Sequence, residues 1–286
     1  PDWSASFVGF AEIQAYLADC ATRFGLDPHL QLNTRITRAE YTTPGCWRLT
    51  SDAGPLGEFD ILINAMGNQH TPLYPNVEGI DSFQGDSWHA TRWNHEVNLQ
   101  GKKVIVVGSA ASAVQIVPEI AQYVGHLTVL QRSANWIMPR GRKVYSAGQR
   151  WRARHVPALI KLTRWVQRLT MGQVAYAVTI GHKRMGQFEA MVEKFINRSV
   201  ENAALRKALL PDTRYGCKRG LVSDDFYPAL NRENVELVAE GLARVTPTGI
   251  VTSGGREIAA DVIIYCTGYK ILDYERFDVI GRDGKN

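Results

Sequence analysis

Residues 102–132 read KKVIVVGSAASAVQIVPEIAQYVGHLTVLQR, and this stretch decides the fold class. An apolar run that ends at Val107 is followed by a small-residue turn, by apolar residues at helical spacing and by a second apolar run. The order predicts a strand, a turn, a helix and a second strand, which together make a βαβ unit. The chain is therefore expected to be an α/β protein.

The turn of this unit, GSAASA at residues 108–113, follows a strand and opens a helix, which is the context of a dinucleotide-binding fingerprint. Gly108 permits a tight turn, and the first N–H groups of the helix would receive a pyrophosphate. Ala110 stands where the fingerprint usually has its second glycine, so an ordinary strand-to-helix turn is the alternative. The candidate cofactor-binding residues of this unit are Gly108, Ser109, Ala110, Ser112, Ala113 and Gln115.

The end of the second strand indicates which dinucleotide would bind. An NAD site places Asp or Glu there to bind the ribose 2′-hydroxyl, whereas this chain has Gln131, Arg132 and Ser133. A planar guanidinium can bind a 2′-phosphate with two hydrogen bonds. Arg132 and Ser133 therefore predict NADP as the cofactor, and the alternative is that Arg132 is an ordinary surface residue.

Two segments far apart in the chain share one pattern. FDILINAMG at residues 59–67 and ADVIIYCTG at residues 260–268 each follow a glycine-punctuated β-meander and end in a small residue and glycine. We expect both to be buried strands of two related, Rossmann-like nucleotide-binding domains, with Gly67 and Thr267 at cofactor-binding positions.

Basic residues are concentrated in residues 140–168 of a chain whose net charge is +5 and whose isoelectric point is near 9.0. We expect this segment to be the solvated face of a helical insert in the NADP domain, and a membrane-surface role is the main alternative. No nucleic-acid-binding module is recognisable, so no nucleic-acid partner is expected. The predicted buried side of the insert is Trp151, Leu159, Leu162, Trp165, Val166 and Leu169.

The remaining composition narrows the class of protein. No apolar run is long enough to cross a bilayer, and we expect no stable membrane insertion. The four cysteines lie far apart without CxxC spacing, which predicts reduced thiols in a cytoplasmic protein and no metal site. They are Cys20, Cys46, Cys217 and Cys266.

FQGDSWHATRW, residues 83–93, matches the pattern FxGxxxHxxxW through Phe83, Gly85, His89 and Trp93, and it shows no helical or strand period. Together with INAMG, TPLYPNVEG, QRSANW, YGCKRGLVSDDFYPALNR and CTGY, in this order, it resembles the class B flavoprotein monooxygenases along essentially the whole chain. Trp93, where the sister branch would carry tyrosine, favours the Baeyer–Villiger branch. Asn94 departs from that branch, which usually has Pro or Asp there.

The resemblance implies a reaction and roles for several residues. NADPH would reduce FAD, and one oxygen atom of O₂ would be inserted into a ketone substrate to give an ester or lactone. Arg219 matches the family's active-site arginine, and Lys218 its second contact to the 2′-phosphate. Residues 83–93 would be an interdomain linker beside the active site, in which His89 fixes domain orientation and does not transfer protons.

The resemblance also divides the chain. It predicts part of an FAD-binding domain and the linker in residues 1–96, an NADP-binding domain in 97–259 with a helical insert at about 141–210, and a return to the FAD domain in 260–286. No GxGxxG turn precedes Gly108, so the chain is expected to be an internal fragment that does not retain FAD. An N- or S-oxygenating flavin monooxygenase and a catalytically silent NADP-binding module are the alternatives.

Overall fold

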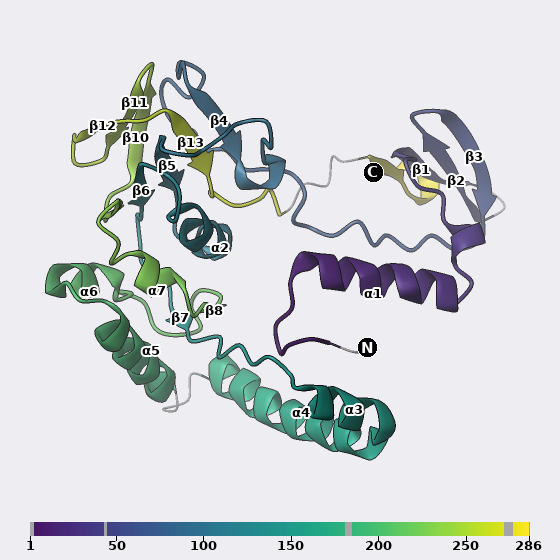
Figure 1. Ribbon diagram of the computed structural model, residues 1–286. Coiled ribbons are helices and arrows are strands. Elements are labelled where there is room, and N and C mark those ends of the chain that lie inside the picture. The colour runs from purple at the N-terminus through teal and green to yellow at the C-terminus, as the bar shows by residue number, and fades with distance from the viewer. Residues whose placement is uncertain (1–2, 43–44, 181–184, 272–276, 286) are drawn as a thin grey trace. The chain divides into compact units, whose positions relative to one another are not determined.

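The structure is a computed structural model that describes residues 3–42, 45–180, 185–271 and 277–285. The chain divides into two compact units (Figure 1). Unit 1 comprises Pro1–Val8 and Tyr74–Gly268, and unit 2 comprises Gly9–Leu73 and Tyr269–Asn286. Each unit is described by itself.

Unit 1 is built on a five-stranded sheet in the order β4-β13-β5-β6-β9. Every neighbouring pair in it is parallel, which confirms the predicted α/β class. Its strands are β4 (Asp86–His89), β5 (Lys103–Val107), β6 (His126–Leu130), β9 (Val235–Val238) and β13 (Val262–Tyr265). The central strands β5, β6 and β13 are mostly apolar and buried because a parallel sheet is covered on both faces.

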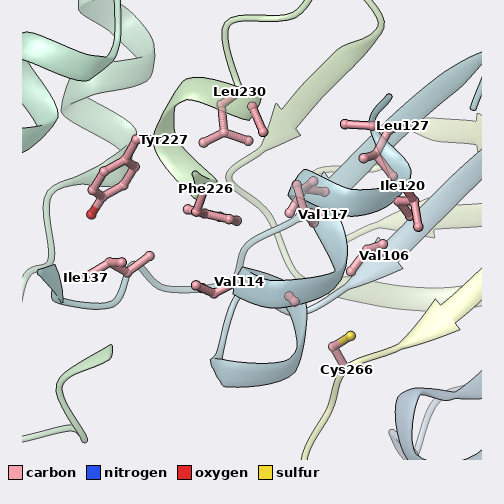
Figure 2. Close-up of a cluster of buried hydrophobic side chains, with 14 of the residues drawn as sticks. Val106, Val114, Val117, Ile120, Leu127, Ile137, Phe226, Tyr227, Leu230 and Cys266 are labelled. Carbon is pink, nitrogen blue, oxygen red and sulfur yellow. The ribbon is translucent and has the colours of Figure 1, made fainter. Parts of the chain in front are cut away.

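Alternating residues of β5 show what covers each face of the sheet. Val104 and Val106 belong to one buried cluster, which includes residues of α2 (Ala111–Ile120) and α7 (Phe226–Ala229) (Figure 2). Ile105 and Val107 belong to a second cluster, which includes residues of a β-meander. Helices therefore cover one face of the sheet, and the meander covers the other. The meander consists of β10 (Leu242–Thr246), β11 (Gly249–Thr252) and β12 (Glu257–Ala259).

Unit 1 contains a series of helices in the range for which the sequence predicts an insert. This insert leaves the core after β7 (Ile137–Met138) and returns at β8 (Leu221–Val222), and these two short strands pair in parallel. Its helices are α3 (Ala147–His155), α4 (Pro157–Thr179), α5 (Met185–Ser199) and α6 (Ala203–Leu209). Helix α3 begins at a capping box formed by Ser146 and Gln149, which satisfies two backbone N–H groups.

The prediction of which residues form the buried side of the insert is wrong. All six residues assigned to it are exposed, with Trp151 and Trp165 about 60% exposed. Among the described side chains of α4, the half-buried apolar ones are instead Ile160 and Val174. The apolar residues of α4 do recur at helical spacing. This periodicity predicts a helix, but it does not show which side of the helix packs against the rest of the protein. The exposed six are Trp151, Leu159, Leu162, Trp165, Val166 and Leu169.

Unit 2 contains helix α1 (Phe10–Arg23) and a four-stranded sheet in the order β14-β1-β2-β3. Antiparallel hairpins join β1 (Ile36–Thr42), β2 (Cys46–Ser51) and β3 (Gly54–Phe59), whereas β14 (Asp278–Ile280) pairs with β1 in parallel. This hairpin sheet is the meander that the glycine-rich sequence predicts.

The second of the two echoed strands is confirmed, and the first is not. Residues 262–265 form β13, fully buried in unit 1. Residues 60–67 are not a strand, and Ile61 and Ile63 are 78% and 82% exposed. A buried parallel strand needs a partner on each side for its backbone groups, and in the part of unit 2 that the structure describes residues 60–67 pair with no strand.

The sheet of unit 1 also differs from the sequence-based division of the chain. Strand β4 lies before residue 97 and β13 lies after residue 259, yet both belong to the sheet that contains β5. The difference arises because sheet neighbours are set by backbone pairing between distant segments, which no local pattern reveals.

Candidate functional site

The turn after β5 is shaped by the end of a neighbouring strand. Gly108 has φ +106°, and a Cβ built on it would lie 2.7 Å from the carbonyl oxygen of Cys266. A side chain at this position would therefore meet both left-handed backbone strain and a backbone collision. The glycine that the sequence assigns to a phosphate-binding turn is thus also required by the packing of β5 against β13.

Helix α2 begins immediately after this turn with its first N–H groups free of a side-chain cap. Ala110 is the N-cap residue, has extended backbone and provides no side-chain hydrogen bond. Ala113 is buried in the core, Ser112 is half-buried, and Ala110 is exposed. An uncapped helix N-terminus presents partial positive charge that suits an anion.

The other two candidates of the βαβ unit have structural partners. The side chain of Gln115 is exposed and donates to the carbonyl oxygen of Ala111 at 2.9 Å, so it bonds its own helix. Ser109 is buried, and its carbonyl oxygen accepts a 3.1 Å hydrogen bond from the side-chain amide of Asn135. This bond links the turn after β5 to the segment after β6. Sequence reasoning missed Asn135, although it lies within the QRSANW motif.

Lys218 and Ser133 lie together at the carboxyl end of β6, although 85 residues separate them. The Nζ of Lys218 donates to the Oγ of Ser133 at 2.8 Å and to the carbonyl oxygen of Ala134 at 3.2 Å. Arg132, the residue before Ser133, is exposed, and its aliphatic stem lies beside Gly241. Within the described ranges Arg132 forms no ion pair with an acidic side chain, and Lys218 bonds Ser133, the neighbour of Arg132 in the sequence, where a 2′-phosphate is expected.

Arg219 follows Lys218 directly and is exposed to solvent. Its guanidinium forms no ion pair with any residue that the structure describes. The backbone of the next residue, Gly220, packs closely against the Tyr215 side chain, because a Cβ at Gly220 would lie 2.6 Å from the hydroxyl oxygen of Tyr215. The structure thus places an uncompensated cation in the same loop as Lys218.

The segment of residues 83–93 is not the irregular loop that its lack of period predicts. Asp86–His89 form strand β4, followed by one turn of 3₁₀ helix at Ala90–Arg92. Trp88 and Trp93 pack edge-on with ring centroids 5.6 Å apart. A Cβ at Gly85 would lie 2.5 Å from the carbonyl oxygen of Asp261, so this glycine is required by the pairing of β4 with β13. Phe83 is half-buried against the second cluster.

His89 is buried and acts as the cap of the short helix that follows it. Its Nδ1 accepts the N–H of Thr91 at 3.3 Å and lies 3.0 Å from the Thr91 hydroxyl oxygen. Burial lowers the pKa of His89 below its ordinary value; the backbone of Gly268 opposes the shift and Arg92 adds to it. The imidazole is therefore held neutral, as suits a structural residue.

The last two candidate cofactor-binding residues, Thr267 and Gly67, belong to different units, and each is described within its own unit. Thr267 is half-buried just after β13 in unit 1. Gly67 in unit 2 has φ +71°, and a Cβ built on it would have no neighbour within 4 Å. Among the described residues, no group of three or more His, Cys, Asp or Glu side chains could hold a metal ion. No described helix is long and apolar enough to cross a membrane, and all four cysteines are free.

Comparison with known proteins assigns the chain to a family. A model described as flavin-binding monooxygenase-like matches residues 1–278. A Baeyer-Villiger monooxygenase of Streptomyces coelicolor is 36% identical over 287 aligned positions, and one of Pseudomonas aeruginosa is 35% identical over 289. Both alignments cover the whole chain and 55% of the relative, so the chain spans about half the length of the relatives it matches.

Solved structures show the same fold. A structure of OTEMO in complex with FAD and NADP has a TM-score of 0.85 at 27% identity, covering 99% of this chain and 60% of that one. A closed structure of cyclohexanone monooxygenase has a TM-score of 0.81 at 25% identity, covering 99% of this chain and 60% of that one.

Proposed function

The chain belongs to the flavin-binding monooxygenase-like family, and from this we propose that the protein is an NADPH- and FAD-dependent Baeyer–Villiger monooxygenase. The reaction inserts one oxygen atom of O₂ into a ketone and gives an ester or lactone. The relatives from S. coelicolor and P. aeruginosa that bear this name support the assignment over the whole length of the chain.

One observation carries the cofactor assignment. Lys218 is anchored at the carboxyl end of β6 to Ala134 and to Ser133, the residue after Arg132, whose guanidinium forms no ion pair among the described residues. Ligands of open α/β sheets bind at the carboxyl ends of the strands, and a dianionic 2′-phosphate suits two adjacent cations. The uncapped N-terminus of α2 begins at the end of the neighbouring strand β5 and suits the pyrophosphate. These residues fit NADP.

The described residues of unit 2 do not by themselves form an FAD site. Gly67 is the single flavin candidate there, and the segment before it is exposed and not a strand. FAD is therefore proposed from the family and from the FAD that OTEMO binds. When bound, flavin supplies the reduction of O₂ and the transfer of oxygen, which no protein side chain can perform.

Arg219 is proposed to stabilise the negative charge that develops on oxygen as the ketone is attacked. Arginine keeps its positive charge at any working pH, and a fixed cation aimed at a developing oxyanion lowers the barrier without reorganisation. Its exposure and its lack of an acidic partner among the described residues leave the guanidinium available for this role.

The test is product formation by the full-length protein with FAD, NADPH, O₂ and a panel of cyclic ketones, followed by mass spectrometry. We expect a lactone one oxygen atom heavier than the ketone. Arg219→Ala should abolish the lactone while NADPH is still consumed and hydrogen peroxide accumulates. Arg214→Ala removes an exposed arginine from the same loop and should leave the yield unchanged.

Two other outcomes would contradict the proposal. Conversion of sulfides to sulfoxides without any lactone would assign the protein to the N- or S-oxygenating branch. A normal lactone yield from Arg219→Ala would remove this residue from the active site.

A further inference from the structure

Two segments run beside one another where the helical insert leaves the core and returns to it. We call residues 133–142 and 213–225 the closure ladder. Beyond the Lys218 bonds, the indole N–H of Trp136 donates to the carbonyl oxygen of Thr213 at 2.8 Å. The N–H of Leu221 then donates to the carbonyl of Trp136, and that of Ser223 to the carbonyl of Met138, both at 2.9 Å. The backbone bonds of Leu221 and Ser223 thus hold the two segments in parallel register, and the side-chain bonds of Lys218 and Trp136 join them further.

Asp224 closes the end of the ladder that lies farthest from Lys218. One carboxylate oxygen accepts the N–H of Gly141 at 2.9 Å, and the other accepts the N–H of Arg142 at 3.1 Å. Gly141 has φ +60°, and this left-handed turn allows both N–H groups to point at one carboxylate. The first residues of the insert are therefore bonded to Asp224, the second residue after its return strand β8.

These hydrogen bonds stabilise the negatively charged form of the Asp224 carboxyl group. Burial favours a raised pKa for the Asp224 carboxyl, but hydrogen bonds from the backbone of Gly141, Arg142 and Arg140 outweigh it. The pKa is therefore below its usual value, and the group is a carboxylate at neutral pH. The Nε of Arg140 lies 3.9 Å from the carboxylate and adds a weaker attraction.

Asp224 immediately precedes the start of helix α7, which packs in the core of unit 1. The Oγ of Ser223 accepts the N–H groups of Asp225 and Phe226, which fixes the start of α7. The Phe226 and Tyr227 side chains are fully buried in the core cluster that includes Val114 of α2 (Figure 2). The position of Asp224 is thus set by the same core that sets helix α2.

We propose that Asp224 is a positioning residue, which fixes the register of the closure ladder and so holds Lys218 and Arg219 at the carboxyl end of β6. The inference rests on the proposed function for the roles of these two residues. Asp224 itself acts through the ladder and touches no substrate. Loss of its two backbone bonds frees one end of the ladder, and the loop that carries Lys218 and Arg219 loses its fixed place against Ser133.

Asp225 provides a matched control. It carries the same charge one residue later, but its carboxylate is exposed and bonds the Nη2 of Arg140 at 2.9 Å. Asp225→Asn therefore removes a negative charge and one exposed ion pair and leaves the bonds to Gly141 and Arg142 intact. Asp224→Asn removes the charge and replaces one acceptor oxygen by an amide donor that faces an N–H group.

The first measurement is the dissociation constant of the whole chain for NADPH and for NADH, by fluorescence titration. Asp224→Asn should weaken NADPH binding about tenfold, since a charge-assisted contact to the 2′-phosphate is impaired. NADH binding should change much less, because NADH lacks that phosphate. Asp225→Asn should leave both constants unchanged. Equal weakening for both cofactors, or an equal effect of Asp225→Asn, would overturn the positioning role.

The second measurement is amide hydrogen exchange in the ladder, which needs no cofactor. Asp224→Asn should speed exchange at Leu221 and Ser223 while β5 and β6 keep the protection seen in the wild type and in Asp225→Asn. Unchanged exchange at these two amides would overturn the inference. If the wild type binds NADPH no better than NADH, the proposed cofactor role fails, and the exchange result alone decides whether Asp224 sets the ladder.

Discussion

His89 of β4 is the register partner of Tyr265 of β13, and the ring of Tyr74 lies edge-on to both, with centroids 5.5 Å from each. The imidazole is thus buried between a sheet neighbour and an aromatic ring, and its Nδ1 accepts the N–H of Thr91. His89, the histidine of the FxGxxxHxxxW motif, thus fixes the position of β4 and of the turn that follows it.

His89 should make stability depend on pH in one direction. Its pKa is lowered in the folded protein, so below an unfolded-state value of about 6.5 the unfolded chain binds more protons. The stability from the neutral imidazole is therefore full above that pH and is lost as the pH falls towards the folded-state value. His89→Asn keeps an oxygen that can accept the Thr91 N–H but does not titrate. The loss of melting temperature between pH 7.5 and 5.5 should be smaller in His89→Asn than in the wild type; an equal loss would contradict this.

Gly108→Ala should destabilise the protein more than Gly101→Ala does. Both glycines have positive φ, +106° and +71°, so both variants carry backbone strain. Open space surrounds a Cβ at Gly101, whereas one at Gly108 collides with the carbonyl of Cys266. We expect a loss of about 1 kcal/mol at Gly101 and about 3 kcal/mol at Gly108 in urea unfolding. Equal losses would show that strand β13 yields to the added methyl group.

Arg132→Ala should raise the Michaelis constant for NADPH about tenfold or more and leave that for NADH nearly unchanged. The expected cause is the loss of one charge-assisted contact to the 2′-phosphate. Arg232→Ala is the control, because it removes an exposed arginine that lies outside the candidate site. Steady-state kinetics with both cofactors measures the effect. If both Michaelis constants rise together, Arg132 does not select the phosphate.

Cys217 and Cys266 should differ sharply in alkylation. Cys217 is exposed and directly precedes Lys218, whereas Cys266 is buried at the end of β13. Burial raises the pKa of the Cys266 thiol to about 12, so almost no thiolate is present at pH 8. Iodoacetamide at pH 8 followed by peptide mass spectrometry should find Cys217 modified and Cys266 spared. NADPH should slow the reaction of Cys217 if the cofactor covers the Lys218 loop; rapid labelling of Cys266 in folded protein would contradict its burial.

The parts of the fold that the sequence predicts correctly are those that depend on neighbouring residues. The strand, turn and helix of residues 103–120 follow from local periodicity and from Gly108. Residues 59–67 and 260–268 share one pattern, yet only Val262–Tyr265 form a buried strand with partners on both sides, and residues 60–67 pair with no strand among the described residues. Strand β4 was missed because the pattern of Asp86–His89 does not alternate, and its partner lies far along the chain.

At the candidate site, too, local motifs could be predicted from the sequence, whereas contacts between distant segments could not. Arg132 and Lys218 were each predicted from a motif, and the structure brings the segments that carry them together through Ser133. The bond between Lys218 and Ser133 could not be derived from the sequence, since it depends on how the insert returns to the core. Asp224 was missed because an aspartate in a loop carries no signal of the two distant N–H groups that it binds.

The place of β13 in the sheet has a consequence for biosynthesis. Strand β4 pairs with β13 alone in the described sheet, and the N–H of Lys103 donates to the carboxylate of Asp261 across 158 residues. A nascent chain that ends before residue 262 therefore leaves Asp86–His89 without a partner and one edge of β5 open, and both remain so while the whole insert is translated. Long-range closure of this kind is slow and exposes unpaired strand edges. Unit 1 is thus expected to complete its sheet only after residues 262–265 leave the ribosome, and to depend on chaperones until then.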